Sequence, residues 1–124
     1  MYYKELEVWK EAIKLVTYVY QITANYPKSE QFGIVSQIRR CVISIPSNIS
    51  EGAVKHSDKE TLRFLDIALG SLAELDTQMI ISQNLGYIET YEAAEIQISK
   101  VNALLNGLIN YYNKQIEGNN ALVP

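Results

Sequence analysis

The sequence predicts an all-α protein, an antiparallel up-down-up-down four-helix bundle. Four long segments carry apolar residues at helical spacing, short connections with proline, glycine and capping residues separate them, and no stretch alternates as a strand would. A chain of 124 residues, 48% of them hydrophobic, suits one domain with one core. We expect the bundle to occupy residues 1–117 and a flexible tail to occupy residues 118–124.

The first helix is expected over residues 5–25, where two neighbouring apolar stripes span roughly 200° of the helical wheel, twice the usual arc. The helix therefore packs either against two neighbours in its own fold or against another subunit. The first stripe consists of Leu6, Trp9, Ile13, Val16 and Tyr20. We expect the second stripe to form an oligomer interface, made by Val8, Ala12, Leu15, Val19 and Ile22.

The second helix is expected to start near residues 30–33, and its apolar positions run from Ile34 to Ala53, with Pro46 inside it. Its apolar positions lie within about 120° of the wheel, and their phase does not slip across the proline. An interior proline removes one backbone hydrogen bond and clashes with the carbonyl four residues back, so we expect a kink. The alternative is two short helices, with Pro46 at a first helical position.

The third and fourth helices have recognisable starts. Ser57 followed three residues later by Glu60 is a capping box, and Thr90 can cap a helix whose first turn is acidic. Gly86 lies between the two apolar patterns and is a typical helix stop.

The residue types argue against an enzyme or a metal site. The chain has one cysteine, Cys41, on the apolar face of the second helix, and one histidine, His56, in a connection. No phosphate-binding loop or metalloprotease motif is present, so we expect no catalytic residue, metal or cofactor. Acids near the N-terminus and the lack of a long apolar run predict a cytoplasmic protein without a membrane partner.

One polar group falls inside an apolar arc. Asp76 lies among the leucines of the third helix, and burial of a lone carboxylate is costly, so it should have a partner. Arg39 and Arg40 lie level with Glu74 and Asp76 in an antiparallel hairpin, which predicts a structural salt bridge. The alternatives are an arginine that faces outward as a phosphate contact, an exposed Asp76, or an enzyme that uses the cluster.

Positive charge is sparse in a chain of net charge −3. The one local cluster surrounds the second connection, where Asp58 and Glu60 dilute it, so it is either a solvated helix end or a nucleic-acid contact. The candidate nucleic-acid contacts are Arg39, Arg40, Lys55, Lys59 and Arg63.

Three stretches carry a resemblance to a known family: LEVWKEAIKLVTYVY, GIVSQIRRCVISIPSNISEG and KETLRFLDIALGSLAELDTQMIISQNLGYI. Over residues 5–113 the chain resembles the four-helix-bundle family of 23S rRNA intervening-sequence proteins, whose relatives include accessory proteins of diversity-generating retroelements. The resemblance implies a homopentameric ring without enzymatic activity. For the retroelement relatives it also implies binding of RNA or DNA and of a reverse transcriptase through a basic surface. This chain departs from those basic relatives, because it is net acidic and its charges are intermixed.

A polar strip accompanies the apolar face of the second helix. Gln37, Arg40, Ser44, Asn48 and Glu51 share it, and we expect it to contact a subunit or a ligand. The structural polar cluster predicted from the two helices comprises Gln37, Arg40, Asn48, Glu51, Glu74 and Asp76. The sequence thus favours an oligomeric, non-enzymatic scaffold associated with nucleic acid, and the alternative is a protein–protein adaptor.

Overall fold

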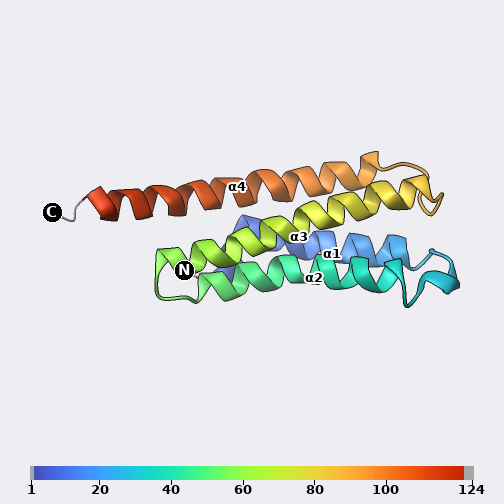
Figure 1. The fold of residues 1–124 in the computed structure, drawn as a ribbon, viewed down its shortest axis with the longest axis horizontal. Helices are drawn as coiled ribbons and strands as arrows, with labels where there is room; N and C mark the ends of the chain where they lie inside the picture. The colour runs from blue at the N-terminus through green and yellow to red at the C-terminus, as the bar shows by residue number, and fades with distance from the viewer. Residues whose placement is uncertain (1, 122–124) are drawn as a thin grey trace.

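The computed structural model describes residues 2–121 as four helices. They are α1 (Glu7–Thr23), α2 (Ile34–Ala53), α3 (Asp58–Asn84) and α4 (Glu92–Ala121). Short 3₁₀ turns, η1 (Tyr3–Glu5) and η2 (Lys28–Glu30), precede α1 and α2. The α1–α2 and α3–α4 connections lie at one end of the bundle and the α2–α3 turn at the other (Figure 1). The predicted all-α, up-down-up-down bundle is confirmed, without a strand in the described part of the chain.

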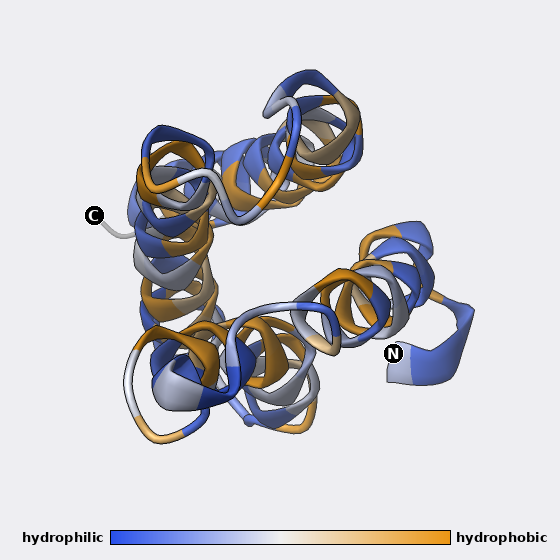
Figure 2. Ribbon diagram, turned by 90° about the vertical axis from the view of Figure 1, so that its right-hand side faces the viewer, coloured by the Kyte–Doolittle hydropathy of each residue, from blue (hydrophilic) through white to orange (hydrophobic). Residues whose placement is uncertain are grey.

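The core is built from the inward stripes of all four helices, so that the hydrophobic sides of the ribbons face one another (Figure 2). Side chains with less than 2% exposure include Leu15, Ile38, Ile45, Ile49, Leu65, Leu72, Leu75, Met79 and Leu105. No helix in the described range is long and apolar enough to cross a membrane.

The stripe of α1 that was predicted to face another subunit lies in the core instead. Val8, Ala12, Leu15 and Val19 are 0–4% exposed within the single chain, and Ile22 is partly buried against the same core. The interface prediction for this stripe is therefore wrong. The physical reason is that α1 contacts both α2 and α4, so both of its apolar stripes pack within the fold. Only Ile13 of the other stripe reaches 40% exposure.

Helix α2 continues through Pro46, which is buried. The proline leaves the carbonyl four residues earlier without its usual amide donor. The two carbonyls that follow, those of Ile43 and Ser44, each accept a hydrogen bond from a side chain. The Ser47 hydroxyl donates to Ile43 O at 2.9 Å, and Asn48 Nδ2 donates to Ser44 O at 2.7 Å. These bonds support the backbone around the proline, and the prediction of one helix rather than two is confirmed.

Helix α4 includes residues 118–121, which the sequence placed in a flexible tail. The remainder of that tail, residues 122–124, lies outside the described residues. Figure 1 shows that α4 projects past the α2–α3 turn. At the other end, α3 and α4 are joined by a turn in which Gly86 has a φ of 79°, a conformation that glycine adopts without strain.

Candidate functional site

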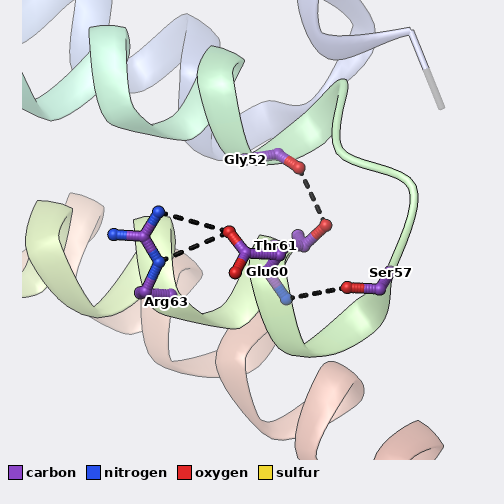
Figure 3. Close-up of polar contacts among 5 residues, drawn as sticks. All are labelled: Gly52, Ser57, Glu60, Thr61 and Arg63. Atoms are coloured by element: carbon purple, nitrogen blue, oxygen red, sulfur yellow. Dashed lines mark hydrogen bonds and ion pairs between the residues drawn. The ribbon is translucent and has the colours of Figure 1, made fainter.

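Two hydrogen bonds that involve side chains hold the α2–α3 turn in place, in addition to its backbone bonds (Figure 3). The Glu60 backbone N–H donates to Ser57 Oγ at 3.2 Å, and the buried Thr61 hydroxyl donates to Gly52 O at 2.8 Å. Ser57 thus caps α3 as predicted. The Glu60 carboxylate pairs with Arg63 at 3.2 Å rather than reaching back to the cap, so only the serine half of the capping box is present.

Three exposed cations of the predicted nucleic-acid site surround this turn: Lys55, Lys59 and Arg63. Lys55 Nζ lies 5.0 Å from the centre of the Phe64 ring, and Arg63 Cζ lies 4.5 Å from it. An aromatic ring flanked by cations is an arrangement that can bind both the phosphates and the bases of a single-stranded nucleic acid. Lys55 and Arg63 therefore meet at the Phe64 ring, and Lys59 lies in the first turn of α3 at the same end of the bundle.

Arg39 does not belong to this group. Its Nε donates to the Thr23 hydroxyl at 3.0 Å, its Nη2 donates to Tyr20 O at 3.2 Å, and its guanidinium stacks over the Tyr20 ring at 4.3 Å. Arg39 therefore adds a second donor to the Tyr20 carbonyl, which also accepts from the Ala24 N–H at 3.2 Å, near the C-terminal end of α1, where a cation interacts favourably with the helix dipole. The predicted pairing of Arg39 with a carboxylate on α3 is absent among the described residues, and its role as a phosphate contact stays a prediction.

Arg40 lies in a groove between α2 and α3. The groove has a volume of about 370 Å³ and is lined by Gln37, Arg40, Cys41, Ser44 and Glu74. No ion pair within 4.0 Å joins Arg40 to a carboxylate in the described range, so the predicted salt bridge to Glu74 is absent. Arg40 and Glu74 lie at the same height on α2 and α3, but both side chains are exposed and do not meet.

Small polar groups form the floor of this α2–α3 groove. The Ser44 and Ser71 hydroxyls lie 2.7 Å apart, and Cys41 Sγ donates to Ser71 O at 3.0 Å. Burial raises the pKa of the Cys41 thiol to about 12, and the nearby Glu74 carboxylate acts in the same direction. Cys41 is therefore a protonated, buried thiol at neutral pH, as expected for a structural cysteine.

The predicted polar cluster is split by the structure. Gln37, Arg40 and Glu74 share the α2–α3 groove, whereas Asn48 bonds within α2 and Glu51 is exposed. Asp76 faces α4, where it accepts a hydrogen bond from the Tyr91 hydroxyl. That bond, together with burial, raises the pKa of Tyr91 to about 12. The partner of Asp76 is thus Tyr91, the residue immediately before α4, and not an arginine of α2.

Two residues that matter here escaped the sequence reasoning. Phe64 was not recognised as the ring beneath the basic turn, although its position next to Arg63 was a signal. Tyr87 was not assigned to the opposite end of the bundle, where its hydroxyl donates to Glu30 at 3.1 Å. No group of three or more histidine, cysteine, aspartate or glutamate side chains in residues 2–121 could hold a metal ion.

The sequence profile of the family described as "23S rRNA-intervening sequence protein" matches residues 4–107 of the chain. The fold is similar to a crystal structure from Bacteroides thetaiotaomicron, described as a protein with unknown function from the S23 ribosomal protein family. The two share 25% sequence identity with a TM-score of 0.73, over 82% of this chain and 97% of that chain. A search among curated proteins finds no match.

Proposed function

The chain belongs to the family of 23S rRNA-intervening sequence proteins, and from this we propose that it is a cytoplasmic scaffold that assembles into a homo-oligomer and binds RNA. The pentamer that the family resemblance implies is the expected assembly. The scaffold carries out no chemistry of its own, consistent with a chain whose one cysteine is buried and protonated.

The observation that carries this proposal is a set of exposed isoleucines on three successive helices. Each exposes more than two fifths of its surface, although an isoleucine of a monomeric bundle is usually placed in the core. Exposed apolar side chains that gather on one face are typical of a protein interface, and we take these five as the candidates for it. The residues are Ile43 (42%), Ile67 (42%), Ile80 (43%), Ile81 (41%) and Ile96 (72%).

The RNA-binding part of the proposal is supported by the basic α2–α3 turn. Lys55 and Lys59 are exposed and form no ion pair among the described residues, so both are available to phosphate. Residues 64–99 carry six acids and no lysine or arginine, so the opposite end of α3 repels a polyanion. RNA is therefore expected at one end of each bundle.

A salt titration with matched variants tests the RNA-binding part. The probe is a labelled hairpin from a 23S rRNA, and binding is measured by fluorescence anisotropy at low and moderate salt. Phosphate contacts weaken steeply as salt rises. Lys55→Glu with Lys59→Glu should abolish binding, whereas Lys10→Glu with Lys14→Glu, on the self-paired surface of α1, should leave most of it. Equal binding by both double variants would refute the assigned site.

A protein adaptor is the second candidate function, and Phe32 favours it. This side chain is 92% exposed, the most exposed large hydrophobic residue in the described range. An exposed phenylalanine in the α1–α2 connection resembles the anchor residue of a protein interface. An oligomer that binds no RNA at low salt would support the adaptor over the RNA scaffold.

A further inference from the structure

The α2–α3 groove presents more polar groups than the chain itself can satisfy. Arg40 makes no ion pair and no hydrogen bond to another described residue. Next to the groove, Gln78 is only 7% exposed, and its Nε2 lies 3.5 Å from Glu74 Oε1. The Gln78 Oε1 atom is buried without a partner in residues 2–121. A buried acceptor without a donor costs free energy in a protein interior. A second molecule that covers the groove can supply the missing donor.

The charge pattern of the chain indicates what covers the groove. Residues 34–50 of α2 carry two arginines and no acid, whereas residues 64–99 of α3 and α4 carry six acids and no lysine or arginine. One copy therefore offers a cation on α2 and carboxylates on its α3–α4 side, and the two surfaces are complementary between copies.

The two complementary surfaces lie at similar heights along the bundle. Ser44 of α2 contacts Ser71 of α3, and Asp76 of α3 contacts Tyr91, the residue immediately before α4. In antiparallel helices these pairs place Arg40 about level with the first turns of α4. There Asp76 and Glu95 line a second groove, of about 330 Å³, with an apolar floor that includes Leu72 and Ile98. Asp76 is bound to Tyr91, but Glu95 makes no ion pair among the described residues.

Exposed isoleucines accompany both surfaces. Ile67 and Ile81 flank Glu74 at intervals of seven residues on α3, so all three lie on one outward ridge beside the α2–α3 groove. Ile96 adjoins Glu95 in sequence on the other surface and is 72% exposed. Apolar anchors next to a complementary charge pair are the usual composition of a protein interface.

We propose that the α2–α3 groove of one copy docks the α3–α4 edge of a second copy, with Arg40 of the first copy paired to Glu95 of the second. The inference rests on the proposed self-assembly and names its surfaces. The two surfaces differ, so the contact is heterologous, and repetition between copies that point the same way produces a ring or an open helix. The pairing requires groups at one height, which Arg40 and Glu95 satisfy.

Charge reversal at the two positions tests this contact in the full-length protein, by sedimentation velocity over a concentration series at low salt. Arg40→Glu and Glu95→Arg, each alone, should weaken association about tenfold or more, because like charges then meet at the interface. The double variant Arg40→Glu/Glu95→Arg should restore wild-type association. Lys114→Glu, an exposed residue outside both surfaces, makes the same change in net charge as Arg40→Glu and should have no effect.

The outcomes separate this inference from the proposed function. If the single variants assemble like the wild type, or if the double variant fails to restore assembly, the Arg40–Glu95 pairing is wrong while the scaffold stands. If the wild type is monomeric at every concentration, both are wrong. Circular dichroism of each variant verifies the fold, and Arg40→Gln, which removes the charge without adding repulsion, should give a smaller loss than Arg40→Glu.

Discussion

Two adjacent arginines of α2 should differ sharply in their effect on stability. Arg39 makes two hydrogen bonds to α1, to the Thr23 hydroxyl at 3.0 Å and to Tyr20 O at 3.2 Å, and stacks on the Tyr20 ring at 4.3 Å. A hydrogen bond from a charged donor contributes about 1 kcal/mol when partly exposed, and a cation–π contact at such a site about 0.5–1 kcal/mol. Arg39→Ala should therefore lower the free energy of unfolding by about 2–3 kcal/mol.

Urea denaturation followed by circular dichroism measures this change, and thermal unfolding provides a second readout. For a domain of this size, 1 kcal/mol corresponds to a shift in Tm of roughly 3–6 °C. Arg40→Ala is the matched control, because Arg40 has no ion-pair partner within the described chain, and it should change the stability by less than about 0.5 kcal/mol. Equal effects of the two substitutions would refute the assignment of Arg39 to the end of α1. The stability comparison is made on dilute, dissociated protein, so that assembly through Arg40 does not contribute.

Three further predictions concern local packing and titration. Gly52→Ala should lower the free energy of unfolding by about 1–3 kcal/mol in urea denaturation, because the new Cβ would lie 3.0 Å from Phe64 Cβ. Gly70→Ala is the control: its Cβ would meet open space, so the change should be neutral or stabilising. Tyr91→Phe should cost about 1 kcal/mol by the same assay, because it leaves the partly buried Asp76 without its donor; an unchanged midpoint would contradict that bond. The Cys41 pKa is raised to about 12 from 9.0, so the folded state holds its proton when the unfolded thiol has lost it. The contribution of the Cys41 thiol to the free energy of unfolding is complete below about pH 9 and is lost as pH rises toward 12, with about 1 kcal/mol lost at pH 10. In Cys41→Ala the free energy of unfolding should fall less between pH 9 and pH 10, as measured by urea denaturation at each pH.

The fold could be read from the sequence because its signals were redundant. The apolar phase of α2 runs unbroken from Val35 to Ile49, and a phase that continues across Pro46 favours one helix over two. The Ser57 cap was likewise a local signal, since a serine hydroxyl needs only the amide three residues later. Both predictions depended on residues close together in the sequence.

The errors arose where the outcome depended on angles between helices. Both stripes of α1 are apolar enough for a core, and only the positions of α2 and α4 decide that Val8 and Leu15 point to the centre. Matching heights likewise placed Arg39 near Asp76, but height does not specify the side of the helix on which each lies. Arg39 points to α1 and Asp76 to α4, which are properties of the packed bundle.

The exposed isoleucines were only partly visible in the sequence. Ile80 belongs to the apolar pattern of α3, yet it is 43% exposed. That excess exposure is the basis for self-assembly, which no pattern within one chain can specify.

The solution mass, measured by light scattering across a concentration series, tests the central claim most directly. We expect a stable assembly at a multiple of the 14.1 kDa chain mass, with five copies as the expected number. A mass of one chain at all concentrations would contradict it, because the exposed isoleucines would then face water in the native protein.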